Sequence, residues 1–196
     1  LGWLELVMPE DNVSPVQRVY AEEVAELCGV EMLERQTRYR ARQASAQELF
    51  DTLAQGGEAA RMELMRMGYT VEPESRHVVL AFEGAESEDL AGQQGSAQEL
   101  RWLTQHTGLS VLVLPLQAYE LALCSLPPDL SMERVEQWIE QACHKAGRSG
   151  LCPIGVSRPV KDIEQIPEAV EQACVACRLG RQIRGAAPPY RYAELG

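Results

Sequence analysis

The spacing of apolar residues in the first third of the chain predicts one long helix. Ser14-Pro15-Val16-Gln17 has the signals of a helix start: Ser at the cap, Pro at the first helical position and Gln three residues after the cap. Apolar residues then recur within an arc of about 140° at 3.6 residues per turn. This 16–30 stripe consists of Val16, Val19, Tyr20, Val24, Leu27 and Val30. We expect a helix over residues 15–54 with a polar middle, ended by Gly56-Gly57.

After this helix the pattern predicts short strands and helices in alternation. Helices are expected at 58–67, 96–108, 131–146 and 166–184, and strands at 77–83, 109–115, 119–126 and 152–156, before an extended end at 190–192. From residue 77 to residue 156 the order is strand, helix, strand, strand, helix, strand, which is the ferredoxin-like βαββαβ order. The predicted fold class is therefore α+β, with the two helices of this stretch covering one face of the sheet. A further strand is expected at 2–8, and its partners must lie elsewhere because one strand cannot bury itself.

The composition narrows the class of protein. With 45% hydrophobic and 24% charged residues, the chain has the average composition of a globular domain. Its formal net charge of −11 disfavours direct contact with nucleic acid, since that affinity depends on neutralising phosphates. No apolar run predicts a membrane span, and six scattered cysteines indicate a reducing, cytoplasmic compartment. The chain begins at Leu1 rather than Met, so we expect it to be part of a longer protein.

One cysteine pair has a spacing that is used in zinc and redox sites. Cys174 and Cys177 form Cys-x-x-Cys, but they lie in mid-helix, whereas such sites normally occupy a turn or a helix start. Both lie within the apolar stripe of the last predicted helix, and a free cysteine packs as a small hydrophobic residue. We therefore predict that both thiols are buried in the core without metal, with a thiol or zinc sensor as the alternative. Cys143, His144 and Cys152 match no standard zinc spacing.

The other polar clusters have ordinary structural explanations. The acidic cluster after the first strand is expected to be a solvated loop rather than a divalent-ion site. The histidines are expected at the surface or at helix ends, and the arginines of the long helix on a solvated face. The acidic cluster consists of Glu83, Glu86, Glu88 and Asp89. The histidines are His77, His106 and His144, and the arginines are Arg35, Arg38, Arg40 and Arg42. Since no nucleotide-binding loop or nucleophile elbow is present either, no catalytic residue, metal or cofactor is expected.

Three segments near the end of the chain occur in a distinctive order. Gly155-Val-Ser-Arg-Pro-Val160 precedes a helix over Ile166–Gly180, and this is followed by Tyr190-Arg-Tyr-Ala-Glu-Leu-Gly196. The series resembles the end of the GGDEF-like middle domain of bacterial PucR/CdaR-type transcriptional regulators. Upstream, Glu48–Leu53 with Gly56-Gly57, and then Met67-Gly68-Tyr69, are similar to the stretch that enters that domain.

The resemblance implies a division of the chain into three parts. Residues 1–33 resemble the last strand and final helix of a GAF-like sensor domain, 34–57 would be a helical linker, and 58–196 would be a degenerate GGDEF-like regulatory domain. Such regulators usually continue into a helix-turn-helix domain, which is missing from this chain. The implied segment would therefore relay the sensing of a small-molecule effector to a DNA-binding domain outside it.

True GGDEF domains make cyclic di-GMP from GTP with a Gly-Gly-Asp/Glu-Glu-Phe turn. There the glycines let the backbone approach the nucleotide and the carboxylates hold metal. The corresponding hairpin here reads Gln117-Ala118-Tyr119-Glu120-Leu121, in which Glu120 is the single match. Glu83 is at best a substitute for the metal-binding Asp of the first strand. Two-metal phosphoryl transfer then has no site, so we expect no enzyme. Nucleotide binding, or residual diguanylate-cyclase-like activity, through Glu83 and Glu120 is the alternative.

The long helix also suggests a homodimer. Met32 and Leu33 lie outside the 16–30 stripe by roughly 80–100° on either side, so a lone helix would expose at least one of them. Closed two-fold dimers are the commonest soluble oligomers. We expect Met32 and Leu33 at such an interface, the alternative being a monomer with two exposed apolar side chains.

Overall fold

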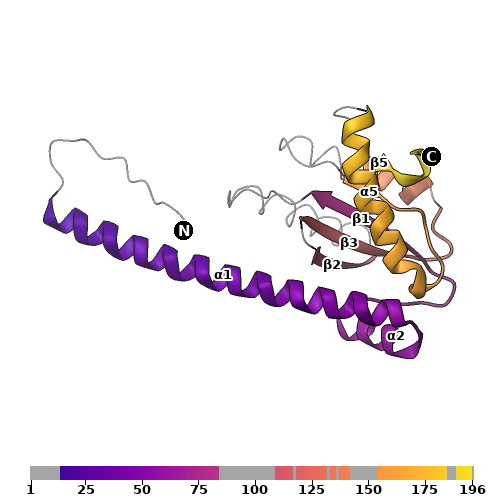
Figure 1. The fold of residues 1–196 in the computed structure, drawn as a ribbon, viewed down its shortest axis with the longest axis horizontal. Helices are drawn as coiled ribbons and strands as arrows, with labels where there is room; N and C mark the ends of the chain where they lie inside the picture. Colours follow the sequence, from indigo (N-terminus) through magenta and orange to yellow (C-terminus); the bar gives the residue numbers. More distant parts are fainter. Residues whose placement is uncertain are drawn as a thin grey trace. The chain divides into compact units, whose positions relative to one another are not determined.

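The computed structural model describes residues 14–83, 109–116, 118–131, 133–135, 137–141, 154–184 and 189–195 (Figure 1). The chain divides into two compact units, Leu1–Arg42 and Gln43–Gly196, and each is described by itself. Several expectations fall outside the described residues: the strand at 2–8, the helix at 96–108, His106, Cys143, His144, Cys152, and the acidic cluster after Glu83.

The first helix, α1, runs over Pro15–Gln55 and confirms the predicted long helix. Its start is a reciprocal capping box: the Ser14 N–H donates to Gln17 Oε1 at 2.8 Å, and the Gln17 N–H donates to Ser14 Oγ at 3.3 Å. At the other end, the Gly56 N–H donates to the carbonyl oxygens of Thr52 and Leu53 at 3.2 and 3.1 Å. Gly56 has a φ of 72°, a left-handed conformation that suits glycine, so the predicted stop is also confirmed.

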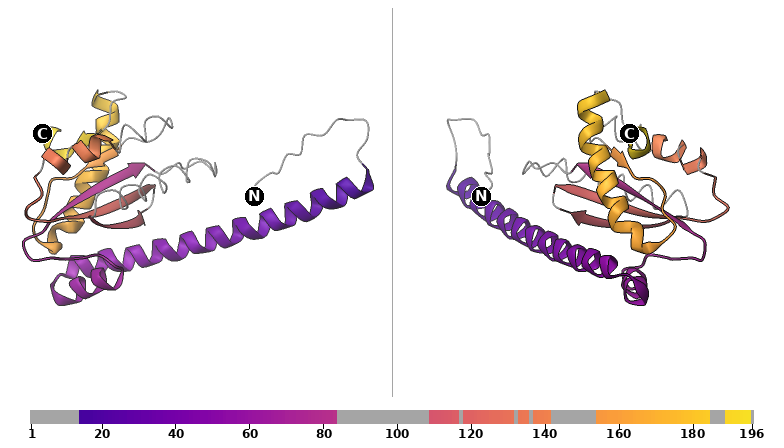
Figure 2. Two further views of the ribbon diagram at one scale, coloured as in Figure 1. Left: turned by 180° about the vertical axis from the view of Figure 1, so that it is seen from behind. Right: turned by 45° about the vertical axis from the view of Figure 1, so that its right-hand side comes forward.

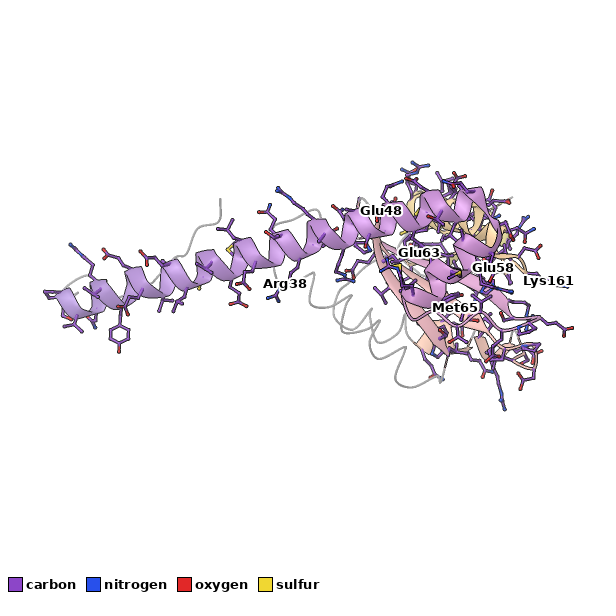
Figure 3. All side chains as sticks on the ribbon, turned by 90° about the horizontal axis from the view of Figure 1, so that it is seen from below. Arg38, Glu48, Glu58, Glu63, Met65 and Lys161 are labelled. Carbon is purple, nitrogen blue, oxygen red and sulfur yellow. The ribbon has the colours of Figure 1, made fainter. Side chains whose placement is uncertain are left out.

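The polar middle of α1 is solvated, as its sequence predicts. Arg38 and Glu34 form an ion pair at 2.9 Å between side chains that are mostly exposed. Such i,i+4 pairs add only a few tenths of a kcal/mol to a helix. Figure 3 shows the Arg38 side chain extending from the helix ribbon.

The second unit contains a five-stranded sheet in the order β2-β3-β1-β4-β5. Figure 2 shows the sheet from two further sides, with the yellow and orange helix α5 (Ile166–Arg184) against it. β3 pairs antiparallel with both β1 and β2, β4 pairs antiparallel with β1, and β5 pairs parallel with β4. The first four strands therefore have the ferredoxin-like arrangement, which confirms the predicted α+β fold class. The strands are β1 Arg76–Glu83, β2 Ser110–Leu116, β3 Tyr119–Leu126, β4 Ile154–Val156 and β5 Tyr190–Arg191.

Helices cover both faces of this sheet. The prediction that the two helices between residues 77 and 156 share one face stays a prediction, because that at 96–108 lies outside the described residues. On one face, Val79 and Ala81 of β1 share a core with α2 (Gly57–Arg66), α5 (Ile166–Arg184) and the end of α1. On the other face, Val78, Leu80 and Phe82 pack with Val135 and Ile139 of a helix described at 133–135 and 137–141. The physical reason lies in β1 itself: its run from Val78 to Phe82 is apolar at every position, and a strand that is apolar on both faces needs cover on both.

Two short 3-10 turns complete the described chain. η1, Ile163–Gln165, leads directly into α5, and η2, Tyr192–Glu194, follows β5. The predicted last helix at 166–184 and the extended end near 190 are therefore confirmed. The helix predicted at 131–146 is helical wherever it is described after residue 132.

Candidate functional site

The hairpin between β2 and β3 is where the sequence predicts a degenerate GGDEF turn. Leu116 pairs with Tyr119, so the loop consists of residues 117 and 118 alone. Gln117 lies outside the described residues, Ala118 is in the turn, and Tyr119 and Glu120 already belong to β3. Because the loop is so short, two of the four positions of the predicted turn, 119 and 120, lie on the strand β3 and not in the loop.

The register of β1 and β3 separates the two acidic positions near this turn, 83 on β1 and 120 on β3. Glu120 lies opposite Phe82, and position 83 lies opposite Tyr119. Phe82 belongs to the core on one face of the sheet, whereas Tyr119 packs against the core on the other face. Because consecutive positions of a strand alternate between faces, the pleat assigns positions 83 and 120 to opposite faces. The register therefore gives these two strand positions no common face of the sheet.

The described residues contain no group of three or more His, Cys, Asp or Glu side chains that could hold a metal ion. Among the helices in the described part of the chain, none combines the length and the apolar character that crossing a membrane requires.

The Cys-x-x-Cys pair lies within α5, as predicted. Cys177 is buried in the core, with 1% of its surface exposed. Cys174 is half-buried at the edge of the same core, so the expectation of two buried thiols holds for Cys177 and is wrong for Cys174. Partial burial still raises the pKa of the Cys174 thiol to about 11, which keeps it protonated near neutral pH.

His77 is a buried residue, so the prediction of a surface or helix-end histidine is wrong. It lies on β1 with 1% of its surface exposed, and its Nδ1 shares a hydrogen bond of 2.8 Å with Tyr69 Oη. Burial lowers the pKa of His77 to about 4. The strand pattern contained the signal, because position 77 has the same parity as the core residues Val79 and Ala81.

The Gly155–Val160 segment, which resembles the regulator family, is a packing joint in the structure. A Cβ atom on Gly155 would lie 1.9 Å from the Ala173 carbonyl oxygen and 2.4 Å from the Cys177 nitrogen. Only glycine therefore lets α5 lie so close to β4. Ser157 Oγ accepts a hydrogen bond from the Val79 N–H at 2.9 Å, which ties the segment to β1.

Arg158 extends the same joint toward the end of the chain. Its backbone N–H donates to Gln172 Oε1 of α5 at 3.0 Å. Its guanidinium carbon lies 5.4 Å from the centre of the Tyr192 ring, within the range of a cation–π interaction. Val160 forms a backbone bridge with His77. The segment thus contacts β1, α5 and η2. Its polar groups, the Ser157 hydroxyl and the Arg158 backbone N–H and guanidinium, make interactions within the domain.

The exposed apolar surface of the described chain lies mainly on α1. All six residues of the 16–30 stripe are exposed, with Leu27 reaching 70%. Met32 and Leu33 are also exposed, at 39% and 65%. On α2, Met62 and Met65 are also exposed, and Met65 is labelled in Figure 3. Exposed apolar patches of this kind mark interaction surfaces.

The strand order, the parallel fifth strand and the helices on both faces define a ferredoxin-like α+β domain whose β2–β3 turn lacks glycines. The family model described as GGDEF-like domain matches residues 56–179, which is more than half of the 196-residue chain. The chain belongs to this family of GGDEF-like domains.

A solved structure has a similar fold. It is the crystal structure of a regulator of polyketide synthase expression from Bifidobacterium adolescentis, with a TM-score of 0.51 and 12% sequence identity. The match covers 78% of this chain and 60% of that one, so this chain corresponds to part of that protein's length. At this identity the likeness shows the fold alone. No curated protein matches the chain in the corresponding comparison.

Proposed function

We propose that the chain is a non-catalytic regulatory segment of a PucR/CdaR-type transcriptional regulator. The observation that carries the proposal is the β2–β3 edge of a GGDEF-like domain. Its turn reads Gln117-Ala118 in place of two glycines, and the register assigns positions 83 and 120 to opposite faces. Two-metal phosphoryl transfer needs carboxylates that converge on the same ions. The missing glycines and the separation of these two positions support a domain that keeps the fold of a cyclase and not its chemistry.

A regulatory role is supported by the solved structure of similar fold. That protein is a regulator of polyketide synthase expression. The net charge of −11 fits a segment that does not itself contact DNA. In this proposal a helix-turn-helix domain outside the chain reads DNA, and an effector is sensed upstream, in a cytoplasmic protein.

The proposed division of labour follows the three predicted parts. Residues 1–33 would belong to a GAF-like sensor, 34–57 would link it to the domain, and 58–196 would form the regulatory domain. The buried positions Ala46, Leu49 and Leu53 support a linker whose end is built into the core of the domain. Met32 and Leu33 are the proposed dimer contacts. Their exposure supports a covered surface in the assembled protein.

The decisive experiment is incubation of the chain with GTP and Mg²⁺ or Mn²⁺, followed by chromatography for cyclic di-GMP and pyrophosphate. An active diguanylate cyclase serves as the positive control, and we expect no product above buffer. Sustained turnover would contradict the proposal. A melting shift with GTP but no turnover would instead favour the nucleotide-binding alternative, and Glu120→Gln should then abolish the shift. Stoichiometric zinc that Cys174→Ser removes would favour the zinc-sensor alternative.

A further inference from the structure

The corner between α1 and α2 has no side-chain cap of its own. α1 ends at Gln55 and α2 begins at Gly57. Gly56 and Gly57 both adopt positive φ, at 72° and 76°. Glycine pays the largest entropy loss on folding, and Gly56, at the N-cap of α2, has no side chain with which to cap the helix. The corner therefore depends on contacts from elsewhere in the domain.

Glu164 supplies such a contact from a distant part of the sequence. Its Oε1 accepts a hydrogen bond from the Gly57 N–H at 3.3 Å, across 107 positions of the chain. The side chain also covers Gly56, because a Cβ atom there would lie 3.0 Å from Glu164 Cγ. A carboxylate at a helix N-terminus is favourable for the helix dipole and for the free N–H groups. Glu164 thus acts as the cap that the corner lacks.

The residues on both sides of this contact are anchored in one core. Leu49 and Leu53 of α1 are fully buried, and Ile163 and Ile166 flank Glu164 in the sequence. All four belong to the same hydrophobic cluster. Because η1 leads directly into α5, the contact joins the end of α1 to the start of α5.

We propose that Glu164 is a releasable clasp that holds the α1–α2 corner and couples the end of α1 to the start of α5. The hydrogen bond is long and Glu164 is exposed, so it opens at small cost, whereas the buried leucines and isoleucines stay packed. A displacement of the end of α1 then also displaces η1, without unfolding the domain. The regulatory meaning of the clasp rests on the proposed function, in which α1 carries the signal. The clasp itself is a property of the folded chain.

The test is hydrogen–deuterium exchange on the whole chain, compared among three variants. Glu164→Ala removes the acceptor and should raise amide exchange about fivefold both at residues 52–60 and at residues 163–168. Glu164→Gln keeps an acceptor oxygen without the charge and should give a smaller rise at the same places. Glu171→Ala, an exposed carboxylate on α5, is the matched control and should change neither segment.

Three results would overturn the clasp. One is unchanged exchange at residues 52–60 in Glu164→Ala. Another is a rise confined to 52–60, which would show a local cap without coupling to α5. The third is an equal rise across β1 and β3, which would show general destabilisation. Turnover of GTP would overturn the proposed function and leave these exchange results as they are, so the two failures can be told apart.

Discussion

Tyr69 Oη and His77 Nδ1 lie 2.8 Å apart inside the core, where both side chains are almost completely buried. Tyr69 follows α2 and His77 is the second residue of β1, so the pair ties the entry of the domain to its central strand. A buried polar group is tolerated when it is hydrogen-bonded, and each side chain supplies that partner for the other. The pair also makes the stability of the domain sensitive to acid.

We expect the free energy of unfolding to fall by about 2–3 kcal/mol on account of His77 as the pH is lowered from about 6.5 to about 4. Burial lowers the pKa of His77 to about 4, and the nearby Asp162 opposes the shift without cancelling it. In this window the unfolded chain binds a proton at His77 that the folded chain does not. The stabilisation is therefore complete above pH 6.5 and is lost as the pH falls toward 4. Urea denaturation at a series of pH values measures this change in the free energy of unfolding.

The control for this prediction is His77→Gln, which keeps a polar side chain and does not titrate. Carboxylates titrate in the same range, so the informative quantity is wild type minus variant. That difference should shrink as the pH falls from 6.5 to 4. A difference that stays constant over this range would show that His77 does not carry the effect.

The sequence predicted the fold well because the fold depends on local signals. The Ser14–Gln17 capping box and the Gly56 stop define α1, and short apolar runs define β1 to β3. The βαββαβ order then leaves few ways to arrange the strands. The helical pattern alone does not show which face of the sheet a helix covers. The continuous apolar run of β1 did contain that information.

The candidate site was less predictable, since it depends on long-range contacts. Register decides that positions 83 and 120 fall on opposite faces, and register is a property of the paired strands. Nothing in the local sequence of Glu164 marks it as the cap of a helix 107 positions away. His77 is buried because its position on β1 has the parity of the core residues Val79 and Ala81, which its polar character alone does not reveal.

Gly155→Ala should destabilise the domain by about 3 kcal/mol, at the upper end for overpacking. The new methyl group would meet the Ala173 carbonyl oxygen and the Cys177 nitrogen at 1.9 and 2.4 Å. Both are backbone atoms of α5, so the whole helix must move rather than one side chain. The urea midpoint reports the loss.

Gly29→Ala is the matched control for Gly155→Ala. Gly29 lies within α1, and a Cβ atom there would have no neighbour within 4 Å. Alanine at that position should therefore keep or raise helix stability, by up to about 1 kcal/mol. Equal destabilisation by both substitutions would show that close packing at Gly155 is not the cause.

The thiols of the described chain should differ in their reaction with N-ethylmaleimide at pH 8. Burial raises the pKa of Cys124 to about 12 and contributes most to raising that of Cys174 to about 11. We expect Cys174 to react about a hundredfold more slowly than an unperturbed thiol, since the thiolate is the reactive form. Cys124 and Cys177 are buried and should react only after denaturation. Peptide mapping by mass spectrometry distinguishes the sites, and rapid labelling of native Cys177 would contradict this packing.

The last prediction concerns Met32 and Leu33. If they form a dimer contact, the chain should be dimeric at tens of micromolar in sedimentation or light scattering. Met32→Glu with Leu33→Glu should then weaken dimerisation by about a hundredfold, because two apolar contacts are replaced by like charges. The matched control is Met62→Glu with Met65→Glu on α2, which changes two exposed methionines and should leave the dimer intact. A chain that stays monomeric over the concentration series, or a dimer that the first pair leaves unchanged, would remove Met32 and Leu33 from the interface.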